Sequence, residues 1–334
     1  MSRHTVIGGA ALVLAGALGW MDRPLFFAAW LAAWWFCLGL LLGTTAIASI
    51  HALTGGRWGQ VLRPAHIALR RRTPWLLLLF LPILAGMHWL YPWSQAAQGL
   101  WFAPLFVGLR FVGYALGAWW LARAPEPPGS GQAAARLLGW MLAGSLAAVD
   151  LLMSLTPDWT SSIFGWLTLT GQMTSGAAAA VALLAFDARG RRDPVWRDLG
   201  NLLLMFVMLQ AYLQFMQFLI IWAENLPKEI SWYLPRLDTG WWLVGLALIL
   251  LQFAAPLLAL LWRSVKDDPR RLGRVAVGML LMQAVGCAWL VVPSVQPQGY
   301  AAWWLLPLVF GGMGLLLFGH LLPAHARQAE VAHG

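Results

Sequence analysis

Long apolar stretches separated by short polar connections run along the whole chain. A transmembrane helix needs about 20 mostly apolar residues, and stretches near that length recur ten times. The pattern predicts an all-α polytopic membrane protein with about ten transmembrane helices, at residues 5–20, 24–50, 74–92, 100–122, 137–155, 160–186, 199–223, 239–262, 275–292 and 301–321. The first stretch ends in Ala15, Gly16 and Ala17, which is similar to a signal-peptide cleavage site. We nevertheless expect it to be a retained helix.

The composition excludes a soluble enzyme. Of 334 residues, 60% are hydrophobic and only 10% are charged, and the mean hydropathy is +0.68. Soluble domains carry about 25% charged residues, so a soluble chain of this composition could not cover its own surface. The 23 tryptophans point the same way, because tryptophan is enriched at both membrane–water interfaces.

The basic residues fall in alternate connections. Eighteen of the 22 lysines and arginines lie at the chain ends and in the even-numbered connections between the predicted spans, against three in the odd-numbered connections. Cytoplasmic loops carry this excess, so we expect both termini in the cytoplasm. The formal net charge of +9 is explained by this bias, and we expect the lipid bilayer rather than nucleic acid as its partner.

We expect one integral membrane domain. Its parts are helices 1–4 within 5–122, a cytoplasmic linker at 123–136, helices 5–10 within 137–322, and a loose tail at 323–334. Residues 55–73 are too polar to cross the bilayer, and their apolar positions recur near helical spacing. They predict a short helix on the cytoplasmic surface.

Three ionisable residues lie inside consecutive predicted spans. Asp150 is the one carboxylate well inside a span, and His88 and Arg110 are expected at compatible depths. An isolated carboxylate in hydrocarbon is costly, so Asp150 needs a partner. The three side chains predict either a centre that carries a proton or contacts quinol, or an ion pair that locks three helices together.

Glutamines form the second polar signal. Gln210, Gln214 and Gln217 recur at helical spacing, Glu224 continues the same stripe, and Gln172 is expected near mid-depth on the preceding span, as are Gln252 and Gln283 on later ones. Glutamine can order water that carries protons toward the periplasm. Alternatively, these amides only form hydrogen bonds between helices, each of which stabilises the protein by about 0.6–2 kcal/mol.

We expect no cofactor bound directly to this chain. Cys37 and Cys287 lie singly in apolar runs, and no Cys-x-x-Cys is present, so ligands for iron–sulfur, zinc and c-type haem sites are lacking. A b-type haem would need two facing histidines, for which His51 and His320 are the one suitable pair.

Several longer stretches resemble one respiratory family, the ActF subunit of Alternative Complex III, a quinol:cytochrome c oxidoreductase. They run from His51 to Gly59, Phe80 to Trp93, Asp150 to Trp159, Asp198 to Asn201, Gln217 to Trp222, Asn225 to Tyr233 and Trp289 to Pro293. The family is related to NrfD and polysulfide-reductase membrane subunits. The chain departs from the pattern at Leu151, where tryptophan is expected, and at Thr156 and Asp158, where an acid and a histidine are expected.

The resemblance implies two four-helix bundles with flanking helices and a metal-free subunit that conducts protons in a bacterial inner membrane. Quinol would be a substrate of the complex. Haem and iron–sulfur clusters would belong to a multihaem cytochrome, an iron–sulfur subunit and an NrfD-like quinol subunit, and a terminal oxidase could dock. The positions that match polar family residues are His88, Arg110, Asp150, Ser154, Gln172, Gln217, Asn225 and Glu229.

Two other functions remain open from the sequence. A purely structural scaffold subunit would use its buried polar groups for packing alone. A secondary transporter would show interruptions at corresponding positions in two halves, whereas Pro82, Pro104 and Pro256 form no matched pair.

Overall fold

The computed structural model describes residues 3–95, 99–123, 127–187 and 195–321, and this part of the chain is helical without a strand. Seven of its helices are long and apolar enough to cross a membrane. They are α2 (Arg23–Thr54), α7 (Pro104–Arg123), α8 (Ser130–Leu151) with its short extension to Leu155, α9 (Phe164–Phe186), α10 (Trp196–Glu224), the run from α13 (Trp241–Ala247) to α14 (Ala255–Leu261), and α16 (Pro269–Val295). The chain is therefore an all-α, membrane-embedded protein.

The other three predicted spans are helical but shorter or broken. α1 (Arg3–Gly19) and α17 (Leu305–Phe318) are short apolar helices. The stretch at 74–92 is divided into α4 (Thr73–Leu78), α5 (Leu81–Ala85) and α6 (Met87–Leu90). Pro82 explains the first break, because proline has no N–H for the preceding turn and its ring crowds the carbonyl four residues earlier.

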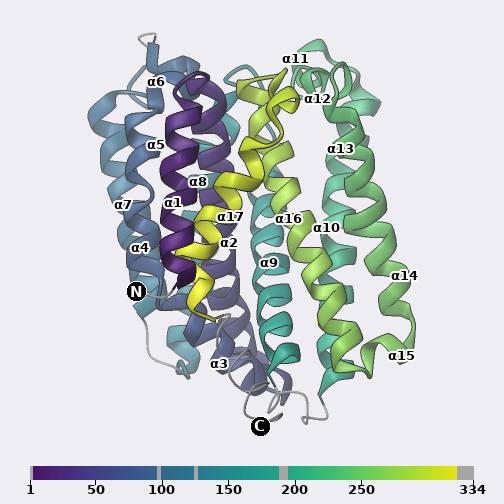
Figure 1. Ribbon diagram of the computed structural model, residues 1–334. Helices are drawn as coiled ribbons and strands as arrows, with labels where there is room; N and C mark the ends of the chain where they lie inside the picture. Colours follow the sequence, from purple (N-terminus) through teal and green to yellow (C-terminus); the bar gives the residue numbers. More distant parts are fainter. Residues whose placement is uncertain (1–2, 96–98, 124–126, 188–194, 322–334) are drawn as a thin grey trace.

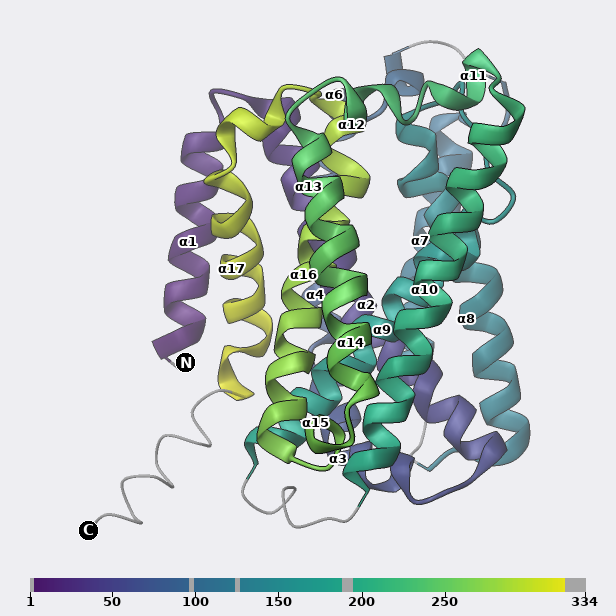
Figure 2. The same cartoon turned by 90° about the vertical axis from the view of Figure 1, so that its right-hand side faces the viewer.

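The core of the protein is built around α2 and α9. In their most apolar stretches 83% and 78% of the residues are buried, against 22–39% in the other long helices. α2 packs along α9, and both pack on α16. Alanine and glycine line this contact, which lets the backbones approach closely. α1 and α17 lie side by side at the edge of the molecule (Figure 2).

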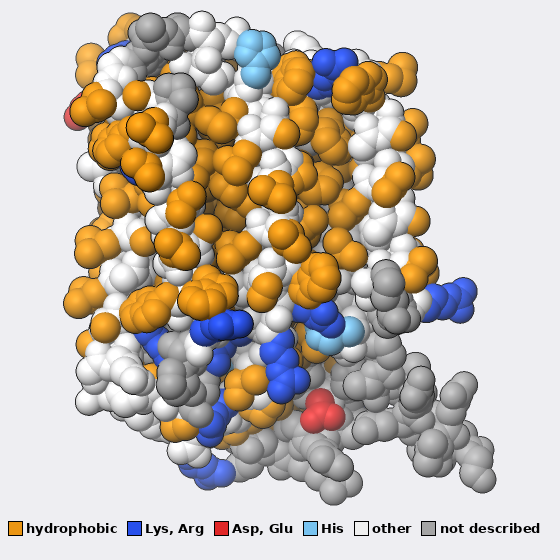
Figure 3. Space-filling view, turned by 90° about the vertical axis from the view of Figure 1, so that its left-hand side faces the viewer, with side chains coloured by type: hydrophobic (Ala, Val, Ile, Leu, Met, Phe, Trp, Pro, Cys, Tyr) orange, Lys and Arg blue, Asp and Glu red, His pale blue; other side chains and the backbone are white. Residues whose placement is uncertain are grey.

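The two ends of the helical body differ in structure. α1 begins and α17 ends at the same end, where α3 (Trp58–Arg70) and α15 (Arg263–Lys266) also lie (Figure 1). α6, α11 (Pro227–Ile230) and α12 (Leu234–Leu237) lie at the other end. On the face in Figure 3, most of the lysines and arginines lie along the lower border of an apolar band. α3 is the short helix that residues 55–73 predict.

The predicted linker is shorter in the structure. α8 begins at Ser130, so the last residues of the range 123–136 belong to that helix, and Arg136 is buried in it with 1% exposure. The predicted tail at 323–334 lies outside the described residues.

Candidate functional site

Asp150 lies in a buried polar centre between α7 and α8, with a side chain 3% exposed. Arg110 donates from Nε to Oδ2 at 2.7 Å and from Nη2 to Oδ1 at 3.3 Å. One turn further along α7, Tyr114 donates its hydroxyl to Oδ2 at 2.5 Å. The indole N–H of Trp101 donates to Oδ1 at 3.2 Å. Each carboxylate oxygen thus accepts two hydrogen bonds, an arrangement suited to a charged acceptor.

Arg110 is itself held in place. Its Nη1 donates to the carbonyl of Trp101 at 2.8 Å, and its guanidinium lies 4.1 Å from the centre of the Trp101 ring. A second ring, that of Phe106, lies 4.8 Å away. Hydrogen bonds and cation–π contacts therefore fix the guanidinium on two sides, and only 12% of the side chain is exposed.

The centre lies at the end of α8 rather than halfway along it. Asp150 follows the first residue of α8, Ser130, by twenty residues, a rise of about 30 Å. The sequence pattern places the carboxylate lower because it starts the helix at residue 137. Ser154 donates to the carbonyl of Asp150 at 2.5 Å, and Tyr91 donates to that of Leu151 at 3.0 Å. These hydroxyls satisfy carbonyls that a helix end leaves without intrahelical partners.

His88 does not join this centre in the structure. Its side chain is exposed, its ring contacts Trp89, and its backbone carbonyl accepts from Gln95. Gly86 and Leu90 are the buried positions of this segment. A residue midway between them lies on the opposite side of a helix, so His88 points outward. Of the three predicted residues, the structure brings together Arg110 and Asp150.

An aromatic cavity lies next to the Asp150 centre. It lies among α2, α4, α7, α8 and α9, and its lining is mostly apolar. The ring of Tyr114, whose hydroxyl binds Asp150, forms part of its wall. The other rings on the wall are those of Trp34, Trp35, Phe80, Phe111 and Trp140.

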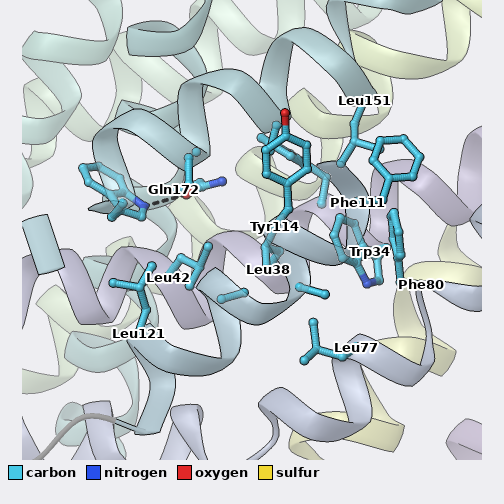
Figure 4. Close-up of a pocket in the computed structure, with 17 residues that line it drawn as sticks. Trp34, Leu38, Leu42, Leu77, Phe80, Phe111, Tyr114, Leu121, Leu151 and Gln172 are labelled. Carbon is cyan, nitrogen blue, oxygen red and sulfur yellow. Dashed lines mark hydrogen bonds between the residues drawn. The ribbon is translucent and has the colours of Figure 1, made fainter. Parts of the chain in front are cut away.

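Gln172 supplies a polar group to the same cavity, and its side chain is 3% exposed. Its Oε1 accepts from the indole of Trp140 at 3.0 Å, whereas its Nε2 has no hydrogen-bond partner among the described residues. In Figure 4, Gln172 lies on the left, Phe80 on the right and Tyr114 between them. The cavity therefore offers flat apolar walls and one amide donor without a partner.

The glutamine stripe of α10 is partly buried and partly exposed. Gln210 and Gln217 are each 7% exposed, whereas Gln214 and Glu224 are exposed. Gln217 accepts from Ser161, while Gln210 pairs with Gln283 of α16. Glu224 is exposed because the last turn of α10 extends beyond the packed core. The described contacts connect Gln210 to α16 and Gln217 to Ser161 in the connection before α9, rather than to Glu224.

The predicted histidine pair has separate environments. His51 Nε2 is hydrogen-bonded to the carbonyl of Gly56 at 2.8 Å, and its ring meets Trp58 edge-on. His320 lies in the short turn that follows α17. His51 lies in the last turn of α2, and its Nε2 is thus engaged by the loop that follows this helix.

Arg236 is a buried residue that the sequence analysis missed, because a single arginine in a connection counts there only as topogenic charge. It is 1% exposed and lies 3.5 Å from the Trp232 ring centre. It donates to the carbonyls of Trp232, Trp289 and Leu290 and to Ser294. Burial lowers the pKa of this guanidinium well below its ordinary value. Arg236 thereby ties α12 to α16, and the Trp232–Arg236 spacing of one helical turn is the signal that could have found it.

The geometry is that of a buried ion pair beside an aromatic cavity, with a separate amide pair, Gln210 with Gln283, between α10 and α16. Comparison of the chain with protein-family models and with curated proteins finds no match.

Proposed function

We propose that this chain is a metal-free membrane subunit of a quinol-oxidising respiratory complex similar to Alternative Complex III. In this proposal the Asp150 centre takes up and releases a proton. One observation carries it: Tyr114 binds the buried carboxylate through its hydroxyl and lines the aromatic cavity with its ring. A buried carboxylate thereby adjoins a cavity with aromatic walls.

The proposed membrane placement has ten spans in two four-helix bundles, with α1 and α17 flanking them. The first bundle would hold α2, the α4–α6 run, α7 and α8, and the second α9, α10, the α13–α14 run and α16. The close packing of α2 on α9 would join the bundles. The basic border in Figure 3 favours a cytoplasmic side at the end where α1 begins, in a bacterial inner membrane.

Proton uptake at Asp150 would require its hydrogen bonds to rearrange. With four donors directed at it, the carboxylate is a charged acceptor. If the guanidinium of Arg110 moves away, the buried carboxylate loses its charge partner, which is strongly unfavourable in a buried site. In this mechanism Arg110 positions the carboxylate of Asp150 and, by moving away, allows it to take up a proton. Tyr114 links the binding of a ligand in the cavity to the carboxylate.

Quinol contact is the second part of the proposal. The aromatic walls suit a flat ring, and the free amide of Gln172 can donate to a ring oxygen. This side chain is nearly fully buried, so a ligand oxygen would relieve an unsatisfied donor. Electron transfer from quinol would use haem and iron–sulfur groups of partner subunits.

Purification of the tagged chain from its native membrane tests the proposal. We expect haem-containing and iron–sulfur subunits to copurify, and quinol oxidation by the complex to be coupled to proton release in liposomes. Asp150→Asn keeps a hydrogen-bonding side chain of the same size. It should lower proton coupling or turnover at least tenfold while the complex still assembles.

The control is Asp267→Asn, which changes an exposed carboxylate in the connection before α16, paired with Arg197 at 2.6 Å. Full coupling in the Asp150→Asn complex would contradict the proton-relay function. Recovery of the chain without redox partners would contradict the respiratory assignment.

A structural scaffold is the second candidate function, because the same ion pair connects α7 to α8. A scaffold predicts the opposite result from the same variant: Asp150→Asn would reduce assembly, and the assembled fraction would keep its coupling.

A further inference from the structure

A second, smaller cavity lies among α9, α10, α16 and the α13–α14 run, apart from the Asp150 centre. Its wall carries the amide side chains of Gln210, Gln214, Gln252 and Gln283 and, among its apolar residues, Met279. We call this space the glutamine cavity. It has room for one water-sized sphere, the smallest space that can hold a water molecule.

Gln252 brings an unsatisfied acceptor to the glutamine cavity. The residue is 8% exposed, and its Oε1 has no hydrogen-bond partner among the described residues. A buried acceptor without a partner costs about 1–3 kcal/mol. Buried polar atoms in native proteins are nearly always paired with protein or ordered water. We therefore expect a hydrogen-bond donor next to Gln252 Oε1.

The facing amides can supply the rest of a binding site. Gln283 Nε2 donates to Gln210 Oε1 at 2.6 Å, and Gln210 Nε2 makes a longer return contact to Gln283 Oε1 at 3.4 Å. Each amide nitrogen carries two N–H groups. This pair uses one N–H from each nitrogen and leaves one on each, and both residues line the same cavity as Gln252.

The backbone around Gln252 departs from an α-helix. Leu248–Ala254 forms a π-helical turn, and the N–H of Ala255 bonds to the carbonyl of Leu250, five residues back. Pro256 provides the cause, because in an α-helix its ring would clash with the carbonyl of Gln252. The wider turn relieves that clash. Such turns occur often at functional sites.

We propose that the glutamine cavity binds a single ordered water molecule. The water donates a hydrogen bond to Gln252 Oε1 and accepts one from the amide pair of Gln210 and Gln283. The water thereby links the π-helical turn to α10 and α16. It also provides an exchangeable hydrogen-bonding molecule among α9, α10, α16 and the α13–α14 run. This site stands on its own contacts and does not depend on quinol oxidation or on Asp150.

Radiolytic labelling of the purified full chain in ¹⁸O-enriched water tests this site. X-ray pulses convert bound water to hydroxyl radicals that oxidise the side chains next to it, and mass spectrometry then locates the ¹⁸O. Met279 lines the cavity with 2% exposure, and Met313 of α17 is the matched control with 0% exposure. We expect Met279 to take up at least fivefold more label than Met313.

Two variants complete the test. Gln252→Leu should reduce the label on Met279 to the level of Met313, whereas Gln60→Leu, at an exposed position on α3, should leave it unchanged. Equal labelling of the two methionines in the unmodified chain overturns the proposal without any variant. Labelling of Met279 that persists in Gln252→Leu overturns it as well.

Discussion

Tyr114 belongs to the Asp150 centre and to the aromatic cavity at once. Its hydroxyl donates to Asp150 at 2.5 Å, and its ring lines the cavity whose far wall carries Gln172. A ligand that fills the cavity must therefore touch the side chain that binds the carboxylate. This contact is a direct route by which ligand binding could change the protonation of Asp150.

Tyr114→Phe is expected to uncouple the aromatic cavity from the Asp150 centre. The ring and hence the cavity wall remain, while Asp150 loses one hydrogen bond, worth about 1.5–3 kcal/mol for a bond to a charged group. We expect the purified complex to lose about tenfold in turnover or proton coupling. Tyr212→Phe is the control, because that ring is 57% exposed on the outer face of α10. Equal activities of the two variants would contradict a transmitting role for Tyr114.

A double-mutant cycle measures the ion pair between Arg110 and Asp150. Arg110→Leu leaves the carboxylate buried without its cation, which costs about 3–5 kcal/mol for a buried pair. Replacing Asp150 by leucine as well removes the uncompensated charge and should restore most of the stability. Denaturant unfolding in detergent micelles gives the free energies.

Arg123→Leu serves as the reference for that cycle, since Arg123 is exposed and rests on Trp119. If the free-energy changes of Arg110→Leu and Asp150→Leu simply add in the double variant, the ion pair has no coupling energy.

The helical segments follow from the sequence because they depend on local apolar runs. The Arg110–Asp150 pair also follows from the sequence. A carboxylate buried among apolar helices needs a cation, and Arg110 is the basic residue inside a predicted span. The position of His88 does not follow. Its direction depends on the breaks that divide the stretch at 74–92, and span depth alone cannot show which side of a short helix faces the core.

The glutamines show the same limit. Spacing predicts that Gln210, Gln214 and Gln217 lie near one another on α10, but it does not show which neighbour covers each of them. The structure buries Gln210 and Gln217 and exposes Gln214. The π-helical turn that orients Gln252 is likewise set by Pro256 together with packing on α16, and apolar periodicity does not reveal it.

The buried His66 on α3 should make the stability of the protein depend on pH. Burial first, then the charge of Arg70 and the proximity of His51, lower the pKa of His66 to about 3, against about 6.5 in an unfolded chain. Between these values the unfolded chain binds more protons, so stability rises with pH through this window and levels off above it. From pH 8 to pH 5 the loss should be about 2 kcal/mol.

Unfolding free energies from pH 5 to pH 8 test this dependence. His66→Gln should remove this part of the slope, and the same substitution at the exposed His88 is the control. A slope that is unchanged in His66→Gln would assign the pH dependence to other groups.

The contact between α2 and α9 depends on Gly43. A Cβ atom there would overlap the carbonyl oxygen of Gln172, and a Cβ at Gly176 would lie 2.5 Å from the backbone nitrogen of Thr44. Backbone atoms cannot rotate away as a side chain can, so Gly43→Ala must push the two helices apart. Overpacking a core typically costs about 1–3 kcal/mol, and we expect the upper part of that range.

Gly39→Ala is the matched control, one turn earlier on the same helix. Its Cβ would meet atoms of Gln172 at 3.4 Å, close to ordinary contact, so its cost should stay below about 1 kcal/mol because little must move. Thermal unfolding of both variants in one detergent compares them directly. Because Gln172 also lines the aromatic cavity, Gly43→Ala should in addition weaken the binding of a quinone analogue, and Gly39→Ala should not. Equal stabilities of the two variants would show that α2 and α9 pack less closely than the structure has them.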